Sequence, residues 1–397
     1  MWKNYVTYIR KCFEILIEIG VLLMKKISSP IVFFSFYMAL MLFQTSSGNM
    51  GTILALVTIA GTIVTAFFSK KVLINHFRLP IESALLLAFI SIVGMTTLLR
   101  NMSVGDYIKL LAQILLCIIM HAMFVSSYQR HYIYWIFILS VTFYAICAIY
   151  SCIKMAGIRY VHSSIVILGT PIDPNFLGIP FVAGTVLLLN NVLNKKKTII
   201  SIFAYMVVVV AIVFTSSRSN LICWIISNGL LLVFYLSNNK VYRIQKLIYM
   251  ILILVVAYLM FRYLSTSFSE QLERMTSFGD GSDNGRIELW ERAIEAWENA
   301  PLFGHGIQGM YRIYGKATHN TYLQLLSETG IVGVLLMVGY LLNVLLKTFK
   351  SEKVYFCVMI GLMIQISFLD ALDNRCVWVI LSWFALLPKE KKLQNKN

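Results

Sequence analysis

The sequence predicts an all-α protein that crosses a membrane about twelve times, on three observations: an apolar composition, apolar runs of span length, and positive charge between alternate runs. Hydrophobic residues make up 59% of the 397 residues and charged residues 13%, whereas about a quarter of a typical soluble domain is charged. A single membrane bundle is therefore a simpler interpretation than a series of soluble domains.

Apolar runs of about 17–25 residues, the length that crosses a bilayer core, follow one another along most of the chain. The last run is short, and only residues 216–218 separate the seventh run from the eighth, so the number of spans is accurate to about one. The runs cover 29–46, 50–69, 81–99, 107–127, 132–153, 176–193, 198–215, 219–236, 247–264, 320–346, 354–371 and 376–387.

Basic residues predict the orientation, because the cytoplasmic connections of membrane proteins are enriched in Lys and Arg. The net charge is +16, but the basic residues form short clusters and no continuous stripe, which argues against nucleic-acid binding. Clusters between alternate pairs of runs predict that both termini are cytoplasmic and that residues 265–318 lie outside. The clusters are Lys25–Lys26, Lys70–Lys71 with Arg78, Arg130, Lys195–Lys197, Lys240 with Arg243 and Lys246, Lys347 with Lys350 and Lys353, and Lys389 with Lys391–Lys392.

The chain is expected to have five parts. Residues 1–27 interleave apolar and charged side chains at helical spacing, which is typical of an amphipathic helix in the cytoplasmic interface; a disordered tail is the alternative. Glu14 and Glu18 interrupt the first apolar stretch, so no cleavable signal peptide is expected. The other parts are a transmembrane bundle over 28–264, an extracytoplasmic loop over 265–318, C-terminal transmembrane helices over 319–388 and a basic cytoplasmic tail over 389–397.

The loop 265–318 is too long and polar for a simple connector. A helix is expected inside it, with Asp283 or Asn284 as the N-cap and Pro301 at its end. The helix either closes the outer face of the bundle or contributes to a substrate site, and the two roles are compatible. Its apolar stripe is expected to consist of Ile287, Trp290, Ile294 and Trp297, with the tryptophans at the headgroup level.

Two arginines and a histidine are expected on the outer face. Arg218 lies in a short outer connection, where positive charge is normally avoided, so it either snorkels to the interface or binds an anion. A guanidinium holds phosphate oxygens with two parallel hydrogen bonds, and Arg286 in the loop offers the same chemistry. His319, where the loop becomes a span, is either a solvated boundary residue or a proton acceptor. Together they fit a diphosphate with a proton acceptor nearby.

Acidic and amide side chains accompany them in other outer connections. Asp173 and Asn175 flank a proline at the start of a span, where Asp or Asn caps the helix. Asp370, Asp373 and Arg375 lie close together in the sequence. They either bind sugar hydroxyls or form a salt-bridged turn, and the residues alone leave both interpretations open.

Glu328 is predicted to lie inside the bilayer, where a carboxylate is costly unless it faces the bundle interior and has a partner. It lies about 12 Å further along the helix than His319, at 1.5 Å rise per residue, and nearly opposite on the helical wheel. We therefore expect Glu328 to support a neighbouring helix or basic residue and not to act as the catalytic base.

No motif predicts a metal, a cofactor or a nucleotide. The 7 cysteines contain no CxxC pair and lie mostly in apolar runs, which indicates packing residues. Gly304, Gly306 and Gly309 lack the context of a P-loop or a dinucleotide fingerprint. These glycines are expected to let the backbone turn sharply or approach a ligand closely.

Two motifs resemble those of a known family. Residues 319–333 read HNxYLxxLxExGxxG, and residues 286–304 contain R-x3-W-x2-A followed by PLFG. Both are similar to motifs of the O-antigen ligase and Wzy-type polysaccharide polymerase superfamily. An Asp-Pro-Asn…Gly element at 173–178 is similar to one seen in capsule polymerases of that family. Met310 departs from the pattern, because the family usually has an aromatic residue after its glycines.

The resemblance implies a GT-C-like membrane glycosyltransferase. It implies that Arg218 and Arg286 engage a lipid diphosphate and that His319 is essential for transfer. Asn320 and Tyr322, from the same motif as the histidine, are expected to bind substrate together with Asp173, Asn175, Asp370 and Arg375.

The expected function is polymerisation of polyprenyl-diphosphate-linked oligosaccharide repeat units, for capsule, exopolysaccharide or O-antigen, on the outer face of the bacterial cytoplasmic membrane. The transfer is expected to need no metal, because the arginines supply positive charge. The alternatives are ligase-like transfer of finished glycan to another acceptor and, less favoured, a flippase or transporter of lipid-linked oligosaccharide. Transporters often carry internal repeats, and the two halves of this sequence show none. Expected partners are the lipid-linked oligosaccharide, membrane lipid, and assembly proteins such as a chain-length regulator and a flippase.

Overall fold

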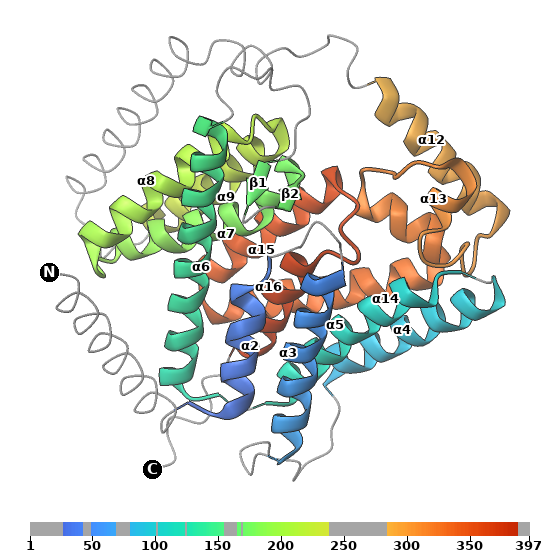
Figure 1. Ribbon diagram of the computed structural model, residues 1–397, viewed down its shortest axis with the longest axis horizontal. Coiled ribbons are helices and arrows are strands. Elements are labelled where there is room, and N and C mark those ends of the chain that lie inside the picture. The colour runs from blue at the N-terminus through green and yellow to red at the C-terminus, as the bar shows by residue number, and fades with distance from the viewer. Residues whose placement is uncertain are drawn as a thin grey trace, which may run out of the picture.

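The computed structural model describes residues 27–42, 49–68, 80–100, 102–123, 125–154, 165–167, 170–237 and 284–387, and most of them are helical (Figure 1). In chain order the elements are α2 (Ser29–Ala39), α3 (Asn49–Phe68), α4 (Ile81–Leu99), α5 (Val104–Ala122), α6 (Ser127–Lys154), β1 (Ile165–Ile167), β2 (Thr170–Ile172), α7 (Pro174–Leu193), α8 (Thr198–Phe214), α9 (Arg218–Ser237), α12 (Asn284–Asn299), α13 (Gly309–Tyr314), α14 (Thr321–Ser351), α15 (Lys353–Gln365), η1 (Ile366–Phe368) and α16 (Arg375–Ala385).

The predicted apolar runs are mainly helical wherever the structure describes them. The run 247–264, residues 1–26 and the tail 389–397 lie outside the described residues. Within the described part, 6 helices are long and apolar enough to cross a membrane: α4, α5, α6, α7, α9 and α14. Others, such as α2, α8 and α16, are apolar but shorter. These helices fit a polytopic membrane protein, and the number of about twelve spans stays a prediction.

A short hairpin corrects the all-α prediction. Strands β1 and β2 pair antiparallel, with Ile165 opposite Ile172 and Ile167 opposite Thr170. Ile165 and Ile167 are buried and Val166 between them is exposed, the alternation expected of a strand with one buried face. Three β-branched residues in succession favour extended backbone over helix. The hairpin lies directly before α7, next to the end of α6 (Figure 1).

Helix α7 forms the centre of one half of the bundle. It packs against α8, α9 and α15, and most of its side chains are buried. In the other half α4 packs along α14, and α16 packs against α5. Two buried tryptophans, Trp378 and Trp383, fill the space around α16. The core is therefore continuous from one half to the other.

One end of the bundle carries the basic connections that we predict to be cytoplasmic, and we call it the basic end. Lys197, in the turn between α7 and α8, lies 4.3 Å from the ring centroid of Trp135 near the start of α6. The rings of Tyr134 and Tyr355 both contact Trp383 near the end of α16, at centroid distances of 6.2 and 5.7 Å. The start of α6, the α7–α8 turn, the start of α15 and the end of α16 therefore meet in space.

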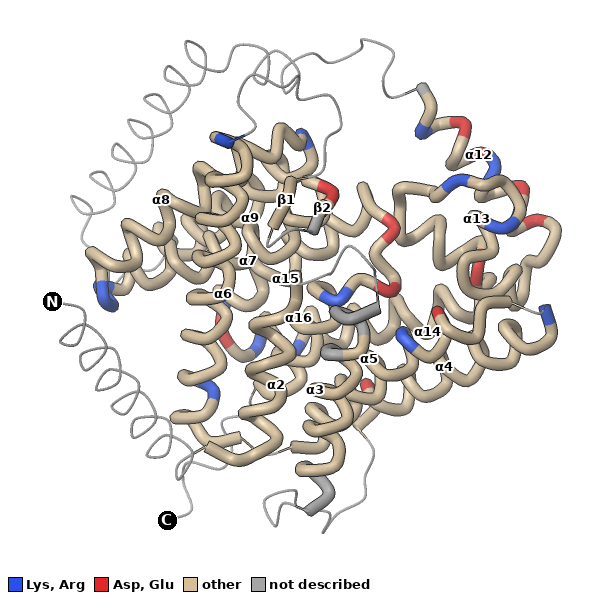
Figure 2. Tube along the Cα trace, viewed as in Figure 1, with Lys and Arg blue, Asp and Glu red and all other residues tan. Residues whose placement is uncertain are grey.

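The opposite end gathers connections that we predict to face outward, and we call it the polar end. Arg312 Nη1 donates to the carbonyl of Arg100, at 2.7 Å, and Gln113 Nε2 donates to the carbonyl of Asp373, at 3.2 Å. Charged residues lie mainly near helix ends and over α12 and α13, whereas the middle of the long helices carries few (Figure 2). The two ends agree with the alternation of connections in the sequence; which end faces the cytoplasm stays a prediction.

The buried face of α12 differs from the predicted stripe. Ile287 and Ile294 are exposed, 53% and 42%, although the sequence pattern places them on the packing face. The residues buried against the rest of the protein are Leu289, Ala293, Ala296 and Ala300. Small side chains allow the backbone of α12 to approach α14, where Ala293 and Ala296 pack with Leu323, and hydrophobicity alone underestimates such a face.

Candidate active site

Helix α14 is interrupted at Gly330, which has φ 63° and ψ −173°. The loop after α12 binds at the break. The backbone N–H of Ile331 donates to the carbonyl of Pro301 at 2.9 Å, and in return the N–H of Gly306 donates to the carbonyl of Glu328 at 2.8 Å. The N–H of His305 donates to the carbonyl of Ser327 at 3.0 Å. The PLFG segment and the glutamate–glycine segment therefore complete each other's backbone hydrogen bonds.

Two glycines make this contact possible. A Cβ at Gly304 would lie 2.3 Å from the backbone carbon of Glu328, and a Cβ at Gly330 would lie 2.4 Å from that of Leu302. Both residues also have positive φ. Part of the family-like motif is thus explained by the close approach of two backbones.

We expect Gly304→Ala and Gly330→Ala each to lower the free energy of unfolding by about 3 kcal/mol or more, because strain in the left-handed region adds to a backbone clash. Gly229→Ala is the matched control, since a Cβ at Gly229 meets no atom within 4 Å. The thermal unfolding midpoint of the purified protein measures the effect. Unchanged midpoints for both loop variants would contradict the packed interface between the loop and α14.

Glu328 is buried and faces this loop. Its carboxylate accepts from Gln324 Nε2, at 3.4 Å, and a Cβ at Gly309, where the loop ends, would lie 3.9 Å from its Cγ. Among the described residues no Lys, Arg or His forms an ion pair with it. The partner of Glu328 in the structure is thus the loop before α13, where the sequence led us to expect a neighbouring helix or a basic residue.

His319 lies in the turn that precedes α14. Its backbone has φ 52°, and its N–H donates to Asp370 Oδ2 at 2.6 Å. Its ring Nδ1 lies 3.7 Å from the same oxygen, and the side chain is 49% exposed. Both the N–H and the hydroxyl of Thr318 donate to Asp370 Oδ1. Asp370 therefore fixes the turn that presents the histidine ring to solvent.

The other residues of this motif are tied into the same turn. Asn320 is the N-cap of α14, and its Oδ1 accepts from the N–H groups of Tyr322 and Leu323 at 3.0 and 3.2 Å. The hydroxyl of Tyr322 donates to the carbonyl of Met363 at 2.9 Å. Both side chains have structural contacts in this structure, which gives them a positioning role in addition to the expected contact with substrate.

Asp173 and Asn175 lie beside the segment that contains Arg218. Asp173 caps α7 by accepting from the N–H of Asn175 at 2.8 Å, as predicted from the sequence. Asn175 Oδ1 accepts from Ser217 Oγ at 2.7 Å, and Arg218 begins α9 directly afterwards. The start of α7 and the start of α9 therefore form one polar segment.

Gln365 connects this segment to the histidine turn. Its Nε2 donates to Asn220 Oδ1 at 2.6 Å and to the carbonyl of Asn175 at 3.3 Å. Five residues further along the chain, Asp370 holds His319. The chain from the end of α15 through η1 thus joins the starts of α7 and α9 to the start of α14.

Arg286 lies apart from these contacts. It is in the first turn of α12 and half-buried, next to residues 238–283, which the structure does not describe. Helix α12 packs on α14, which begins just after His319. No described hydrogen bond or ion pair links Arg286 to His319.

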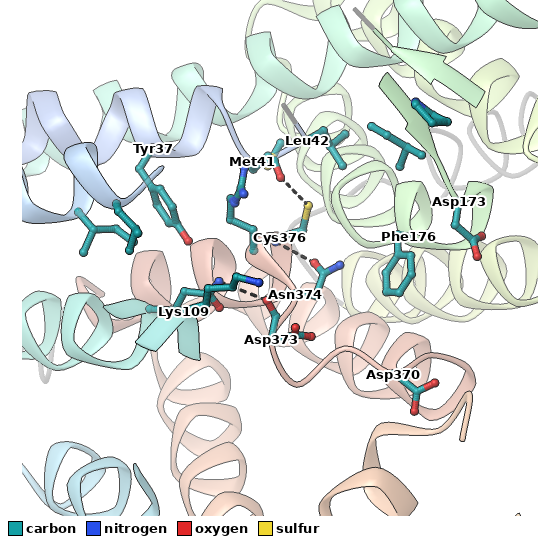
Figure 3. A pocket seen from close by; sticks show the side chains of 16 residues that line it. Tyr37, Met41, Leu42, Lys109, Asp173, Phe176, Asp370, Asp373, Asn374 and Cys376 are labelled. Atoms are coloured by element: carbon teal, nitrogen blue, oxygen red, sulfur yellow. Dashed lines mark hydrogen bonds between the residues drawn. The ribbon is translucent and has the colours of Figure 1, made fainter. Parts of the chain in front are cut away.

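A cavity of about 400 Å³ opens at the polar end, beside Asp370 (Figure 3). In this view Tyr37 and Lys109 lie on one side, Asp173 and Asp370 on the other, and Asp373 between them. Burial raises the pKa of the Asp373 carboxyl above its usual range. Three expected substrate-binding residues line the cavity, namely Asp173, Asp370 and Arg375.

A family model matches the central region of the chain. Residues 202–338 match the model described as O-antigen ligase. This region is similar to the O-antigen ligase family. The match includes Arg218, Arg286 and His319 and both glycines at the loop–helix contact, so the resemblance to this superfamily is confirmed. No curated protein matches the chain.

The matched region covers α9, α12, α13, most of α8 and the first part of α14, including its break. Several residues that complete the site come from outside it. Asp370 and Gln365 follow the matched region in the chain, whereas Asp173 and Asn175 precede it. The described residues contain no group of three or more His, Cys, Asp or Glu side chains arranged to hold a metal ion.

Sequence reasoning missed the polar residues that connect or line the site from within apolar helices. Gln365 joins three segments, and Gln113 and Tyr37 line the cavity. A signal was present for the two glutamines, because each interrupts an apolar run of span length, where polar side chains are usually functional or paired. Tyr37 carries no such signal, since tyrosines are common near span ends.

Proposed function

We propose that the chain polymerises polyprenyl-diphosphate-linked oligosaccharide repeat units on the outer face of the bacterial cytoplasmic membrane. The observation that carries the proposal is the contact between His319 and Asp370. His319 lies within the region that matches the O-antigen ligase model, together with Arg218 and Arg286, and Asp370 follows that region in the chain. Nucleotide sugars are absent from the outer face, and a polyprenyl diphosphate supplies the leaving group of the donor there while it stays in the bilayer.

In the proposed reaction, a hydroxyl oxygen of the acceptor attacks the anomeric carbon of the donor. A new glycosidic bond forms as the bond from that carbon to the lipid diphosphate breaks. Arg218 and Arg286 stabilise the negative charge that develops on the departing diphosphate. His319 takes the proton of the attacking hydroxyl.

Asp370 supports the histidine in this scheme. Because Nδ1 of His319 faces Asp370 Oδ2 at 3.7 Å, Nε2 is the ring nitrogen that remains for the acceptor hydroxyl. The carboxylate stabilises the imidazolium that forms when the ring takes up the proton. The bonds from Thr318 and His319 N–H to Asp370 fix the position of the ring relative to α14.

Membrane lipid and the lipid-linked oligosaccharide are the proposed partners, together with assembly proteins such as a flippase, which supplies the substrate, and a chain-length regulator. The polymerase assignment is favoured over the ligase assignment by the Asp-Pro-Asn element at the start of α7, which resembles that of capsule polymerases. In this fold the element lies beside the segment of Arg218.

The purified chain, given lipid-diphosphate repeat units as the sole substrate, is expected to produce a ladder of longer lipid-linked glycans. It is expected to do so without nucleotide sugar and in the presence of a chelator, because arginines supply the positive charge. Single transfer that occurs after a different acceptor is added, with no ladder, would identify a ligase. Movement of intact substrate across a liposome without new glycosidic bonds would identify a flippase.

A further inference from the structure

Two buried polar atoms in the wall of the cavity have no hydrogen-bond partner among the described residues: the hydroxyl of Tyr37 and the side-chain carbonyl of Gln113. Tyr37 is 0% exposed and Gln113 is 7% exposed, and both line the cavity. Buried polar groups are nearly always hydrogen-bonded in native proteins. Both groups are therefore available to a molecule with hydrogen-bonding groups that enters the cavity.

The charges around the cavity favour a neutral ligand. Three carboxylates line it, from Asp173, Asp370 and Asp373, against two cationic side chains, Lys109 and Arg375. Lys109 is already paired with Asp106, at 2.8 Å. A diphosphate would therefore meet a wall with an excess of carboxylates, and like charges repel at short range.

The mixture of groups suits sugar hydroxyls, each of which donates one hydrogen bond and accepts others. The Tyr37 hydroxyl and the Lys109 ammonium can donate, whereas the Gln113 carbonyl and the Asp373 carboxylate can accept. Phe176 adds an apolar surface to the lining. The volume of about 400 Å³ lies in the range of roughly 300–1,000 Å³ that is usual for small-molecule sites.

The cavity lies next to the proposed proton acceptor. Asp370 lines the cavity and also holds the backbone of His319 through its Oδ2, at 2.6 Å. Arg218 and Arg286, the proposed ligands of the donor diphosphate, do not line it. A sugar bound in the cavity would thus lie beside the histidine turn and apart from the proposed ligands of the diphosphate.

We propose that this cavity is the acceptor site, and that it binds a neutral terminal sugar of the acceptor oligosaccharide through Tyr37 and Gln113. The inference rests on the proposed function, because the acceptor is defined by the transfer reaction. In a lipid-linked acceptor the anomeric oxygen of the reducing-end sugar is bonded to diphosphate, so the attacking group is a non-anomeric hydroxyl. The cavity holds the terminal sugar with one hydroxyl directed toward His319.

The experiment measures binding without reaction. The probe is the repeat-unit oligosaccharide released by mild acid from lipid-linked units, which accumulate in source cells that lack this chain. The full-length protein in lipid nanodiscs is titrated with this oligosaccharide. Tyr37→Phe and Gln113→Leu are each expected to weaken binding roughly threefold to tenfold, as expected for the loss of one neutral hydrogen bond.

Tyr340→Phe is the matched control, because its hydroxyl is equally buried but contacts Cys117, at 3.1 Å, and does not line the cavity. It is expected to bind the oligosaccharide like the wild type. Thermal unfolding separates a ligand-binding role from a structural one. Tyr37→Phe without ligand is expected to be at least as stable as the wild type, since it removes an unpartnered buried hydroxyl, but to gain less stability from the oligosaccharide.

Equal binding by wild type, Tyr37→Phe and Gln113→Leu would overturn the acceptor site, as would no binding by the wild type. Displacement of the oligosaccharide by inorganic pyrophosphate would also overturn it, since the cavity would then hold the anionic part of the donor. If both variants weaken binding but the protein forms no glycosidic bond, the cavity would still be a sugar-binding site. The proposed function would then be wrong. If Tyr37→Phe fails to fold, the affinity of Gln113→Leu for the oligosaccharide tests the proposal alone.

Discussion

His319→Ala is expected to abolish measurable glycan synthesis, with a fall in the initial rate of about 10²–10⁴-fold, the usual contribution of a positioned proton acceptor. The ring is 49% exposed and contacts Asp370, so its loss creates no cavity in the core. The variant should therefore reach the membrane in normal amount. The rate at which purified protein extends lipid-diphosphate repeat units measures the effect.

His131→Ala is the control for this change. His131 is also exposed but lies at the basic end, where its Nε2 accepts from the indole of Trp135 at 2.9 Å. It is expected to retain the full rate. Asp370→Asn keeps the shape of the side chain and is expected to cause a smaller fall, because it removes the charge that stabilises the imidazolium. A wild-type rate from His319→Ala would remove this residue from the proposed mechanism.

Arg286→Lys is expected to lower the rate roughly a hundredfold, although the positive charge is kept. Lysine cannot hold two phosphate oxygens with a planar pair of donors, and the loss of one preorganised donor to a developing anion typically costs about 10²–10³ in rate. Arg218→Lys is expected to behave in the same way. The initial rate of ladder formation measures both.

Arg292→Lys is the matched control within the same helix. Its guanidinium pairs with Glu288 on the surface of α12 and lies over the ring of Tyr314, at 5.5 Å from the centroid. This exposed pair contributes little to stability, and the variant should polymerise normally. If Arg286→Lys were as active as Arg292→Lys, the proposed diphosphate contact of Arg286 would be wrong.

The sequence predicted the helical bundle well because long apolar runs leave few alternatives in a membrane. It predicted the N-cap of Asp173 from local chemistry alone. It did not predict the break at Gly330, because the hydrogen bonds that stabilise the break come from Pro301 and Leu302, on a separate segment. In the sequence, the two glycines Gly304 and Gly330 are the only sign of this long-range contact.

Half of the predicted face of α12 was wrong for a related reason, since Trp290 and Trp297 are half-buried whereas the two isoleucines are exposed. The pattern was judged by the largest apolar side chains, Ile287 and Ile294, whereas close packing against α14 selects small ones such as Ala293 and Ala296. The cavity could not be predicted either, because Tyr37 and Gln113 lie far from Asp370 in the sequence. Only the tertiary packing brings α2, α5 and the α15–α16 connection together.

The proposed reaction depends on the polar end facing away from the cytoplasm, because a lipid-diphosphate donor is needed only where nucleotide sugars are absent. Two exposed lysines test this directly: Lys316, between α13 and α14 at the polar end, and Lys196, in the α7–α8 turn at the basic end. Each is replaced by cysteine in a cysteine-free version, and intact cells are treated with an impermeant thiol reagent. Lys316→Cys is expected to react, and Lys196→Cys only after the cells are permeabilised. Reaction of Lys196→Cys but not Lys316→Cys in intact cells would place the site in the cytoplasm and contradict the proposed mechanism.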